Sequence, residues 1–372
     1  MEIRTALYTK KEKDMGFQEF NKIRKRRSLF LMFLIVVVTP ILFLNFYGGI
    51  ASQGNVSCIR EGEVVEGIRG FQQNEKMAQS YEGKITDELL EKIHEDYINA
   101  PKGNYYGEEI RNTTYSYFES FFHIGDENYL SVAQAYPDYE GELYYGYSDN
   151  WQALLTSVED FLKLFVLFIV IMVAPLFSWE RECNMTELLQ TAKNGGRRLV
   201  SCKVKMVYAI MNCILVVMLI FICVSHLVKM GWSGFNTSIQ CGIMPYFSLS
   251  ALKCSYGELL LYTVFLGIIA CNSILTIVLL SSLKARKSLY AVMKSIFVMY
   301  VFSFSIWQNI TNNGNINRLL SLFPINALDI YKLTNAVSFG LNGAIHFVLL
   351  VVYHLVFFLI TFTILRKKIK RI

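Results

Sequence analysis

The sequence predicts an α-helical integral membrane protein with six transmembrane helices and an extracytoplasmic α+β domain inserted between helices 1 and 2. Three observations lead to this fold class. Six stretches are long and apolar enough to cross a bilayer, and the Lys and Arg clusters that flank them fall on one side. An acidic segment rich in aromatic residues separates the first two stretches. Apolar residues make up 53% of the chain and charged residues 18%, below the roughly 25% of a soluble domain.

The first stretch, Ser28–Ile50, contains no charged side chain, and a spanning helix needs about 20 such residues. Residues 1–27 precede it and end in the basic run Lys22–Arg27. Short flanking segments rich in Lys and Arg stay in the cytoplasm, so this N-terminal segment is expected there. The apolar run is longer than the roughly 7–15 residues of a signal peptide, which favours an uncleaved anchor.

Five further spans complete the predicted topology. Lys294 shortens the fifth of the six, which can alternatively begin near Leu289. An even number of crossings returns the chain to the cytoplasm, where the basic run Arg366–Arg371 is expected. The predicted location is the cell membrane, in a multi-pass protein with both termini cytoplasmic. The five spans are expected at Phe161–Phe177, Met206–Val228, Leu259–Leu283, Ser295–Ile310 and Ala344–Leu365.

The net charge of +6 divides by side of the membrane. Residues Ala51–Trp151 contain 19 acidic and 7 basic side chains, a net charge of −12, whereas the cytoplasmic segments are strongly positive. Anionic lipids of the inner leaflet attract such juxtamembrane bases. Membrane lipid is therefore the expected partner of the basic clusters. No nucleic-acid partner is expected, because no basic stretch is interleaved with aromatic residues.

Residues 51–157 are expected to form the extracytoplasmic domain, and residues 158–372 the remaining helices. The first segment is dense in Tyr and Phe, whereas disordered segments are poor in aromatic residues. Asp87–Ile98 has the periodicity of a helix that Thr86 can cap, and Thr113–Phe118 has the composition of a strand. The segment is long enough to fold by itself.

The cytoplasmic loop after the second span predicts a short amphipathic helix near residues 184–194. Asn184 can cap its start, and Gly195 with Gly196 ends it. Apolar side chains recur at helical spacing and form one stripe. Anionic lipid would repel the acidic side chains nearby, which disfavours a helix that merely lies on the membrane. The stripe consists of Met185, Leu188, Leu189 and Ala192, and the acidic side chains are Glu180, Glu182 and Glu187.

Three stretches carry a resemblance to a known family: Trp179–Glu182, which reads Trp-Glu-Arg-Glu, the core Glu187–Leu189, and Arg197–Lys203, which leads into the third span. Together with six spans and Leu320–Pro324 before the last one, they resemble the ABC-2-type permeases of ATP-binding-cassette transporters. Many members of that family have only a short loop between the first two spans. The long segment in this chain therefore leaves the substrate class open.

The resemblance implies that the chain is the membrane-spanning permease subunit of an ATP-driven ABC exporter. It also implies an ABC ATPase subunit as partner, with ATP bound there, and a second permease in a homodimer or heterodimer. The short cytoplasmic helix would be the coupling helix, which docks into a groove of the ATPase and meets its basic residues. The residues implied to bind this partner are Glu180, Arg181, Glu182, Met185, Glu187, Leu188, Leu189 and Arg197.

No catalytic, cofactor-binding or metal-binding residues are predicted. The sequence contains no G-x-x-x-x-G-K-[ST], no H-E-x-x-H and no G-x-S-x-G. We therefore expect no enzymatic activity in this chain, with ATP hydrolysis confined to the partner. The eight cysteines form no C-x-x-C pair, and the sequence leaves open a bridge between Cys241 and Cys254 in the short outer loop.

Uncharged polar residues within the spans are the remaining candidates for function. Asn45, Asn212 and Asn272 are candidate residues of a transport pathway, although hydrogen bonds between helices are the favoured role for such side chains. No Asp or Glu lies near the midplane of a predicted span, which argues against transport driven by protons or sodium. The alternative function is a membrane-anchored ligand sensor or receptor that uses the extracytoplasmic domain. A sensor needs a cytoplasmic output domain, and the cytoplasmic segments are too short for one.

Overall fold

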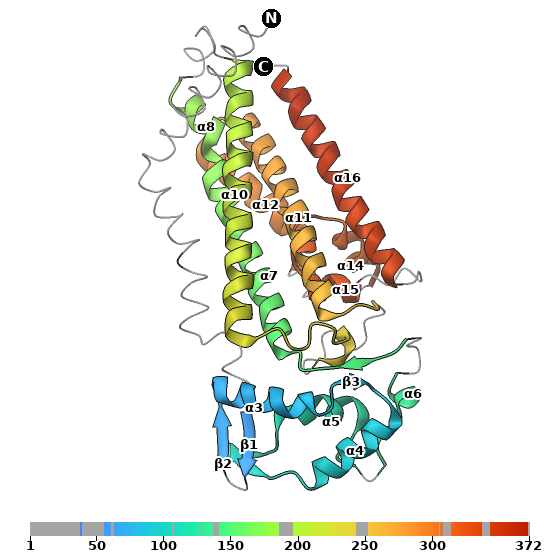
Figure 1. Cartoon of the computed structure of the whole chain (residues 1–372). Coiled ribbons are helices and arrows are strands. Elements are labelled where there is room, and N and C mark those ends of the chain that lie inside the picture. Colours follow the sequence, from blue (N-terminus) through green and yellow to red (C-terminus); the bar gives the residue numbers. More distant parts are fainter. Residues whose placement is uncertain are drawn as a thin grey trace, which may run out of the picture.

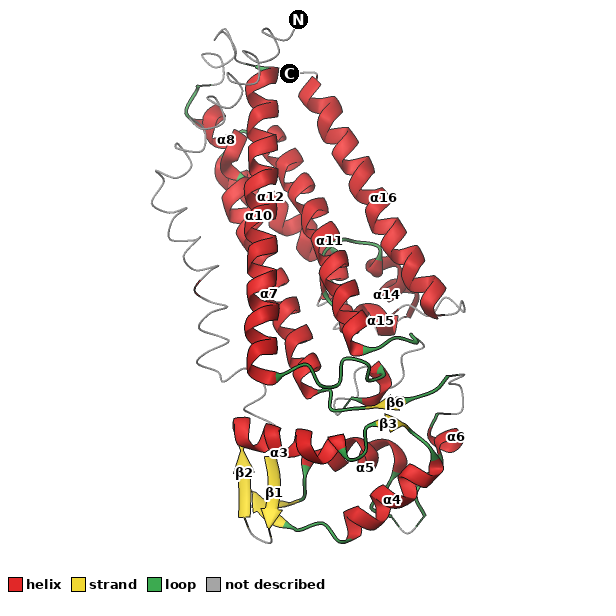
Figure 2. Cartoon of the chain, in the orientation of Figure 1, coloured by secondary structure: helices red, strands yellow, loops and turns green. Residues whose placement is uncertain are grey.

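Long helices run side by side in one bundle, and a smaller unit of short helices and strands lies at one end of it (Figure 1, Figure 2). The part of the chain that the structure describes is mostly helical, at 74%, with small sheets only. This computed structural model describes residues 38, 56–60, 63–105, 108–126, 128–136, 141–185, 196–242, 252–304, 306–307, 314–336 and 343–370.

Four helices in the described part of the chain are long and apolar enough to cross a membrane. They agree with the second, third, fourth and sixth predicted spans, and they make this a multi-pass helical membrane protein in outline. The first predicted span, Ser28–Ile50 with Asn45, lies outside the described residues except for Val38. The four helices are Asp149–Glu182, Arg197–Met230, Tyr256–Lys284 and Val348–Lys370.

The first of these helices begins well before its predicted start at Phe161. It consists of α7 (Asp149–Val173) followed directly by α8 (Pro175–Glu182). Its first turns, up to residue 157, were assigned to the extracytoplasmic domain, but their polar groups have partners within the bundle. The Gln152 amide donates to the Tyr256 hydroxyl at 2.8 Å, and the Trp151 indole donates to the Ser233 carbonyl at 2.7 Å. Satisfied polar groups allow the helix to extend into the packed end of the bundle.

The fifth predicted span differs most from the structure. α12 covers Ser288–Val301, so it starts near Leu289 and ends short of Ile310. Its 14 residues give about 21 Å of helix, less than the roughly 30 Å of a hydrocarbon core. The turn that follows is fixed by Asn326, whose amide donates to the Phe302 carbonyl at 2.6 Å and whose Oδ1 accepts from the Phe304 N–H at 2.8 Å. Further along the described chain come the short helices α14 (Gly314–Ser321), η4 (Asn326–Leu328) and α15 (Ile330–Ala336).

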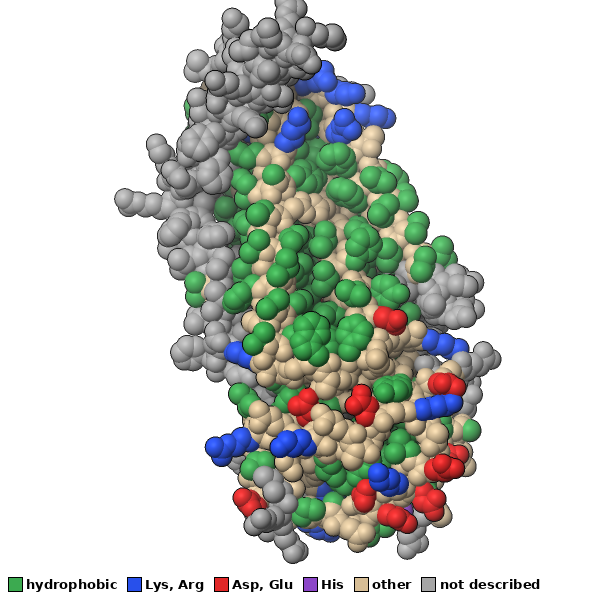
Figure 3. Space-filling view, in the orientation of Figure 1, with side chains coloured by type: hydrophobic (Ala, Val, Ile, Leu, Met, Phe, Trp, Pro, Cys, Tyr) green, Lys and Arg blue, Asp and Glu red, His purple; other side chains and the backbone are tan. Residues whose placement is uncertain are grey.

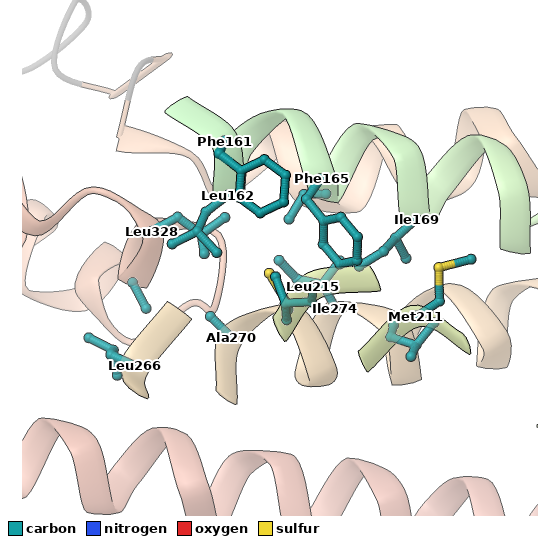
Figure 4. Packing of buried hydrophobic residues seen from close by; sticks show 14 of the residues in the cluster. Phe161, Leu162, Phe165, Ile169, Met211, Leu215, Leu266, Ala270, Ile274 and Leu328 are labelled. Carbon is teal, nitrogen blue, oxygen red and sulfur yellow. The ribbon is translucent and has the colours of Figure 1, made fainter. Parts of the chain in front are cut away.

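A continuous apolar core holds the bundle together. Its centre is α11 (Tyr256–Lys284), which contacts α7, α10 (Arg197–Met230), α12 and α16 (Gly343–Lys370). Figure 4 shows aromatic and aliphatic side chains of α7 packed against those of α10 and α11. The close approach of α7 to α11 depends on Gly267, because a Cβ atom there would lie 2.5 Å from Cδ1 of Leu162.

The smaller unit has its own core, built largely from aromatic side chains. Its described strands form antiparallel pairs, β1 with β2, β3 with β6 and β4 with β5. The helix expected at Asp87–Ile98 is present, and Thr86 caps it by accepting from the Leu89 N–H at 3.2 Å. The elements are β1 (Val56–Arg60), β2 (Glu63–Glu66), α3 (Gly67–Gln79), β3 (Gly83–Lys84), α4 (Asp87–Ile98), β4 (Gly103–Tyr105), β5 (Glu108–Ile110), η2 (Thr113–Tyr115), α5 (Ser116–Phe122), α6 (Val132–Ala135) and β6 (Tyr144–Tyr145).

The strand predicted at Thr113–Phe118 is wrong, since this stretch forms η2 and the start of α5. Asn112 is the physical reason. Its side-chain oxygen accepts from the Thr114 N–H at 2.9 Å, and its carbonyl accepts from the Tyr115 N–H at 3.1 Å, which starts a helical turn. Strand propensity mostly measures how a side chain fits a pleated surface, so local capping and aromatic packing override it in this stretch.

The connection between α10 and α11 joins the smaller unit to the bundle. Ser238 exchanges two hydrogen bonds with the backbone of Tyr144, of 2.9 and 3.0 Å, and the Tyr136 hydroxyl donates to the Gln240 carbonyl at 3.3 Å. Met230 and Cys241 belong to the core of the unit. The described part of the smaller unit therefore shares its core with the end of α10 and with the α10–α11 connection.

All eight cysteines are free thiols, so Cys241 and Cys254 form no bridge. Cys241 is buried in the core of the smaller unit. Burial raises the pKa of the Cys241 thiol to about 12, and it raises the pKa of Cys254 equally far. Both thiols are protonated at neutral pH, and a protonated thiol is a poor nucleophile.

Charge and apolar surface are segregated along the bundle. Figure 3 shows Lys and Arg at the end of the bundle away from the smaller unit, apolar side chains over its middle, and most Asp and Glu on the smaller unit. Exposed apolar side chains cover α10, α12 and α16. A helical surface of this kind suits a membrane, where the outer face of each spanning helix contacts lipid.

The turn after α10 gives a test of this packing. Gly234 has φ of +77°, and a Cβ atom there would lie 1.9 Å from the Tyr147 carbonyl oxygen. We expect Gly234→Ala to lower the free energy of unfolding by more than about 1 kcal/mol, because both the backbone and the clash oppose it. Thermal unfolding of the purified full chain in detergent measures the loss.

Gly231→Ala is the matched control. Gly231 has a similar φ of +80°, but the nearest atom to its Cβ position lies 3.7 Å away, so it reports the backbone cost alone. Equal losses of Tm in the two variants would contradict the proposed clash.

Candidate functional site: the charged end of α8

α8 ends at the residue that was expected to start another helix. Asn184 has φ of +54°, the Asn184 N–H donates to the Arg181 carbonyl at 3.0 Å, and the Met185 N–H donates to the Glu180 carbonyl at 2.9 Å. This pair of bonds around a left-handed residue is a Schellman motif, and Asn tolerates that backbone conformation. An N-cap residue is typically extended, so Asn184 ends α8 and does not cap the helix predicted near 184–194.

The rest of that predicted helix cannot be compared with the structure. Residues 186–195, which include Glu187, Leu188 and Leu189, lie outside the described residues. The chain is described again from Gly196, which precedes α10 with φ of +62°. Arg197 is exposed at the first position of α10.

Glu180 contacts a buried lysine. Its carboxylate forms a hydrogen-bonded ion pair with Lys203 of α10, whose side chain is only 1% exposed. Removing one partner of a buried pair leaves an uncompensated charge, at a typical cost of about 3–5 kcal/mol. Glu180 is predicted to meet a basic residue of another subunit, and within this chain its partner is Lys203.

Arg181 binds the end of α11. Its guanidinium donates to the carbonyl oxygens of Ser282, at 3.4 Å, and of Leu283. These carbonyls belong to the last turn of α11, where backbone acceptors lack helical partners and the helix dipole is negative. A cation placed there stabilises the helix end and joins it to α8.

Glu182 binds the start of α12. Its carboxylate accepts from the N–H of Ser288 at 3.1 Å and from the hydroxyl of Ser288 at 2.7 Å. Ser288 is the first residue of α12, where N–H groups are unpaired and the helix dipole is positive. Glu182, like Glu180, therefore has a partner within the chain.

Three consecutive side chains of α8 thus bind three different helices. Glu180 reaches α10, Arg181 reaches α11 and Glu182 reaches α12. Trp179 and Met185 are 41% and 40% exposed on either side of them. The arrangement can transmit a displacement of this end of α8 to three helix ends, because each contact is directional.

The two described asparagines of the predicted pathway form a pair. Asn212 of α10 and Asn272 of α11 exchange two side-chain hydrogen bonds, of 2.9 and 2.8 Å. Each amide also donates its second N–H to the backbone of its own helix, to Tyr208 and to Ile268. One turn away, the Tyr208 and Thr276 hydroxyls lie 2.5 Å apart. All four amide N–H donors are used, two between the helices and two within their own helix, which favours the structural role over a pathway.

Sequence reasoning missed Lys203 and Ser288 as partners of α8, because they lie far along the chain. It also missed a polar stripe on α7, because its predicted span began after most of it. The spacing of the stripe, i, i+4, i+7 and i+11, was the available signal. The stripe consists of Gln152, Thr156, Glu159 and Lys163.

No family model matches this chain, and neither does any curated protein or solved structure. Within the residues that the structure describes, no group of three or more His, Cys, Asp or Glu side chains is arranged to hold a metal ion.

A double-mutant cycle tests the asparagine pair. We expect Asn212→Ala and Asn272→Ala to be coupled by about 0.6–1.7 kcal/mol, the range of interhelical hydrogen bonds in membranes. The double variant then loses less stability than the sum of the single losses. Reversible unfolding of the full chain in detergent measures each free energy.

Asn212→Ala combined with Ser225→Ala is the control cycle. Ser225 donates only to the Ile222 carbonyl of its own helix, about 20 Å along α10 from Asn212, so the two losses should add. Additive losses for the two asparagines as well would overturn the pairing.

Proposed function

We propose that this chain is the membrane-spanning permease subunit of an ATP-driven ABC exporter of the ABC-2 type. It works with a separate ATPase subunit and with a second permease, and ATP is hydrolysed in the ATPase. It crosses the cell membrane six times, with both termini and the charged end of α8 in the cytoplasm. The unit formed by β1 to β6 is extracytoplasmic.

The contacts of α8 carry this proposal. A permease without a nucleotide site depends on mechanical transmission from its partner, and packed helices move as rigid bodies between discrete arrangements. The three charged side chains Glu180, Arg181 and Glu182 connect the segment next to the predicted coupling helix to α10, α11 and α12. A displacement of that segment is therefore transmitted to all three helices.

The charge distribution supports the orientation. Cytoplasmic loops of membrane proteins are enriched in Lys and Arg. The basic residues Arg197, Lys284, Arg286 and Lys367 lie at the same end of the bundle as the charged end of α8, and the smaller unit lies at the other end (Figure 1, Figure 3).

Cysteine labelling tests this orientation. In full-length chain with its eight native cysteines replaced, Glu142→Cys should react with a membrane-impermeant maleimide in intact cells. Gln190→Cys should react only after the membrane is permeabilised, because the segment is cytoplasmic. Labelling of Gln190→Cys from outside would overturn the orientation.

Two kinds of variant test the coupling. Leu188→Asp with Leu189→Asp places charge in the apolar contact expected with the ATPase, so co-purification of the ATPase should be lost. Glu182→Gln weakens the contact with α12 without touching that surface. We expect it to keep ATPase binding and to lose at least half of the substrate-stimulated ATP turnover, because a neutral amide binds the N–H and hydroxyl of Ser288 less strongly than a carboxylate does.

Arg286→Gln is the matched control for Glu182→Gln, because Arg286 is an exposed charge in the same connection between α11 and α12. It should leave both co-purification and turnover at the wild-type level. Unchanged co-purification in the double leucine variant would remove this segment from the coupling mechanism, and with it the main support for the permease function.

A further inference from the structure

A group of charged side chains lies inside the bundle, on the polar stripe of α7. Glu159 and Lys163 belong to the first candidate membrane span, and Asp329 and Lys332 lie opposite, on the segment of η4 and α15. Charged residues in spanning helices are rare, and they typically mark the path of a substrate or an ion. Because the predicted span began at Phe161, sequence reasoning placed Glu159 outside the membrane.

The contacts in this cluster leave one carboxylate oxygen without a partner. Lys163 donates to Oε1 of Glu159, and its Nζ lies 3.9 Å from a carboxylate oxygen of Asp329. Lys332 Nζ lies 3.6 Å from the same oxygen of Asp329. Oε2 of Glu159 is buried and has no hydrogen-bond partner among the described residues, and the residue is only 5% exposed. A buried acceptor of this kind is destabilising unless something donates to it.

The charges favour a cation as the missing donor. Once Lys163 leaves, two carboxylates, those of Glu159 and Asp329, remain beside one ammonium group, that of Lys332, so the remaining cluster has a net charge of −1. Lys163 has an unusual position among them, because its side chain is 46% exposed while its ammonium group lies between the carboxylates of Glu159 and Asp329. A half-exposed lysine on a flexible stem can leave such a place, because its side chain can extend toward the membrane interface near the start of the span.

We propose that Glu159 and Asp329 form a binding site for a cationic group, an ammonium or a guanidinium, and that Lys163 occupies this site when no ligand is bound. A guanidinium presents five donors in a planar fork, so it can satisfy Oε2 of Glu159 together with Asp329, which the single ammonium of Lys163 does not do. Assigning the cation to a transported molecule rests on the proposed permease function. The binding itself does not.

The surroundings of the site are suited to guide a polar group along α7. Thr156 and Tyr331 share a hydrogen bond of 3.1 Å, and Tyr331 donates to the Gln152 carbonyl at 3.3 Å. Gln152 in turn donates to Tyr256 at the start of α11. Polar side chains therefore continue from Glu159 toward the end of the bundle that meets the smaller unit (Figure 1).

Protection from chemical modification tests the site in the full chain, purified alone into lipid nanodiscs. Dicyclohexylcarbodiimide, an apolar carbodiimide, modifies buried carboxyl groups, and mass spectrometry of the peptide reports the fraction of Glu159 modified. The probe is butylguanidinium, and butylurea is its uncharged isostere. We expect butylguanidinium to halve the modification rate at a concentration at least tenfold lower than butylurea needs. Equal protection by the two compounds would overturn the proposal.

Variants separate the roles of the two side chains. Lys163→Met removes the internal competitor and should lower the half-protecting concentration of butylguanidinium three- to tenfold. Lys163→Gln gives the same measurement should Lys163→Met fail to fold. Asp329→Asn should raise that concentration at least threefold. Asp160→Asn is the matched control, because it removes an exposed carboxylate one residue from Glu159, and it should stay within twofold of wild type.

Weaker protection, or none, in both Lys163 variants would mean that Lys163 is a structural partner of Glu159, and it would overturn the proposed site. No ATPase is present in this experiment. A loss of coupling in the co-purification assay therefore leaves the binding result intact, and failure of the binding assay leaves the coupling result intact.

Discussion

The packing of α7 against α11 is the contact on which the rest of the bundle depends. Gly267 allows the two helices to approach so closely that Leu162 of α7 occupies the space that a side chain at position 267 would need. Hydrogen bonds fix both ends of this contact. At one end the Gln152 amide donates to the Tyr256 hydroxyl, and at the other the N–H of Phe177, in α8 directly after α7, donates to the Ser282 hydroxyl. The helices α10, α12 and α16 all pack on α11, so their positions follow from this pair.

The low dielectric of a bilayer explains where the polar groups of this bundle lie. A polar group in a spanning helix must find a partner within the protein, because no water is present to replace one. Asn212 and Asn272 meet this condition fully, as each uses both of its amide N–H groups. Glu159 does not, since one of its oxygens has no donor. This difference separates a fixed contact between helices from a place where a ligand can bind.

Patterns within a helix could be predicted from the sequence, and contacts between distant residues could not. The lengths of the apolar runs predicted three spans close to the helices observed, which are α10, α11 and α16. Thr86 predicted the start of α4. The start of α7 was missed because Gln152 and Glu159 look like loop residues until their partners on other elements are known. For the same reason the partners of Glu180 and Glu182 were expected only on another subunit. Their partners within this chain, Lys203 and Ser288, are remote in sequence.

The two ends of the bundle are connected by the same helices, and this has a consequence for the proposed permease. At one end, α8 binds α10, α11 and α12 through three consecutive charged side chains. At the other end, the α10–α11 connection binds the smaller unit through Ser238 and Gln240. Rigid helices transmit displacement along their length. Movement of α10 and α11 at the charged end would therefore also move the smaller unit, and in the proposed permease that unit would be part of the transport cycle.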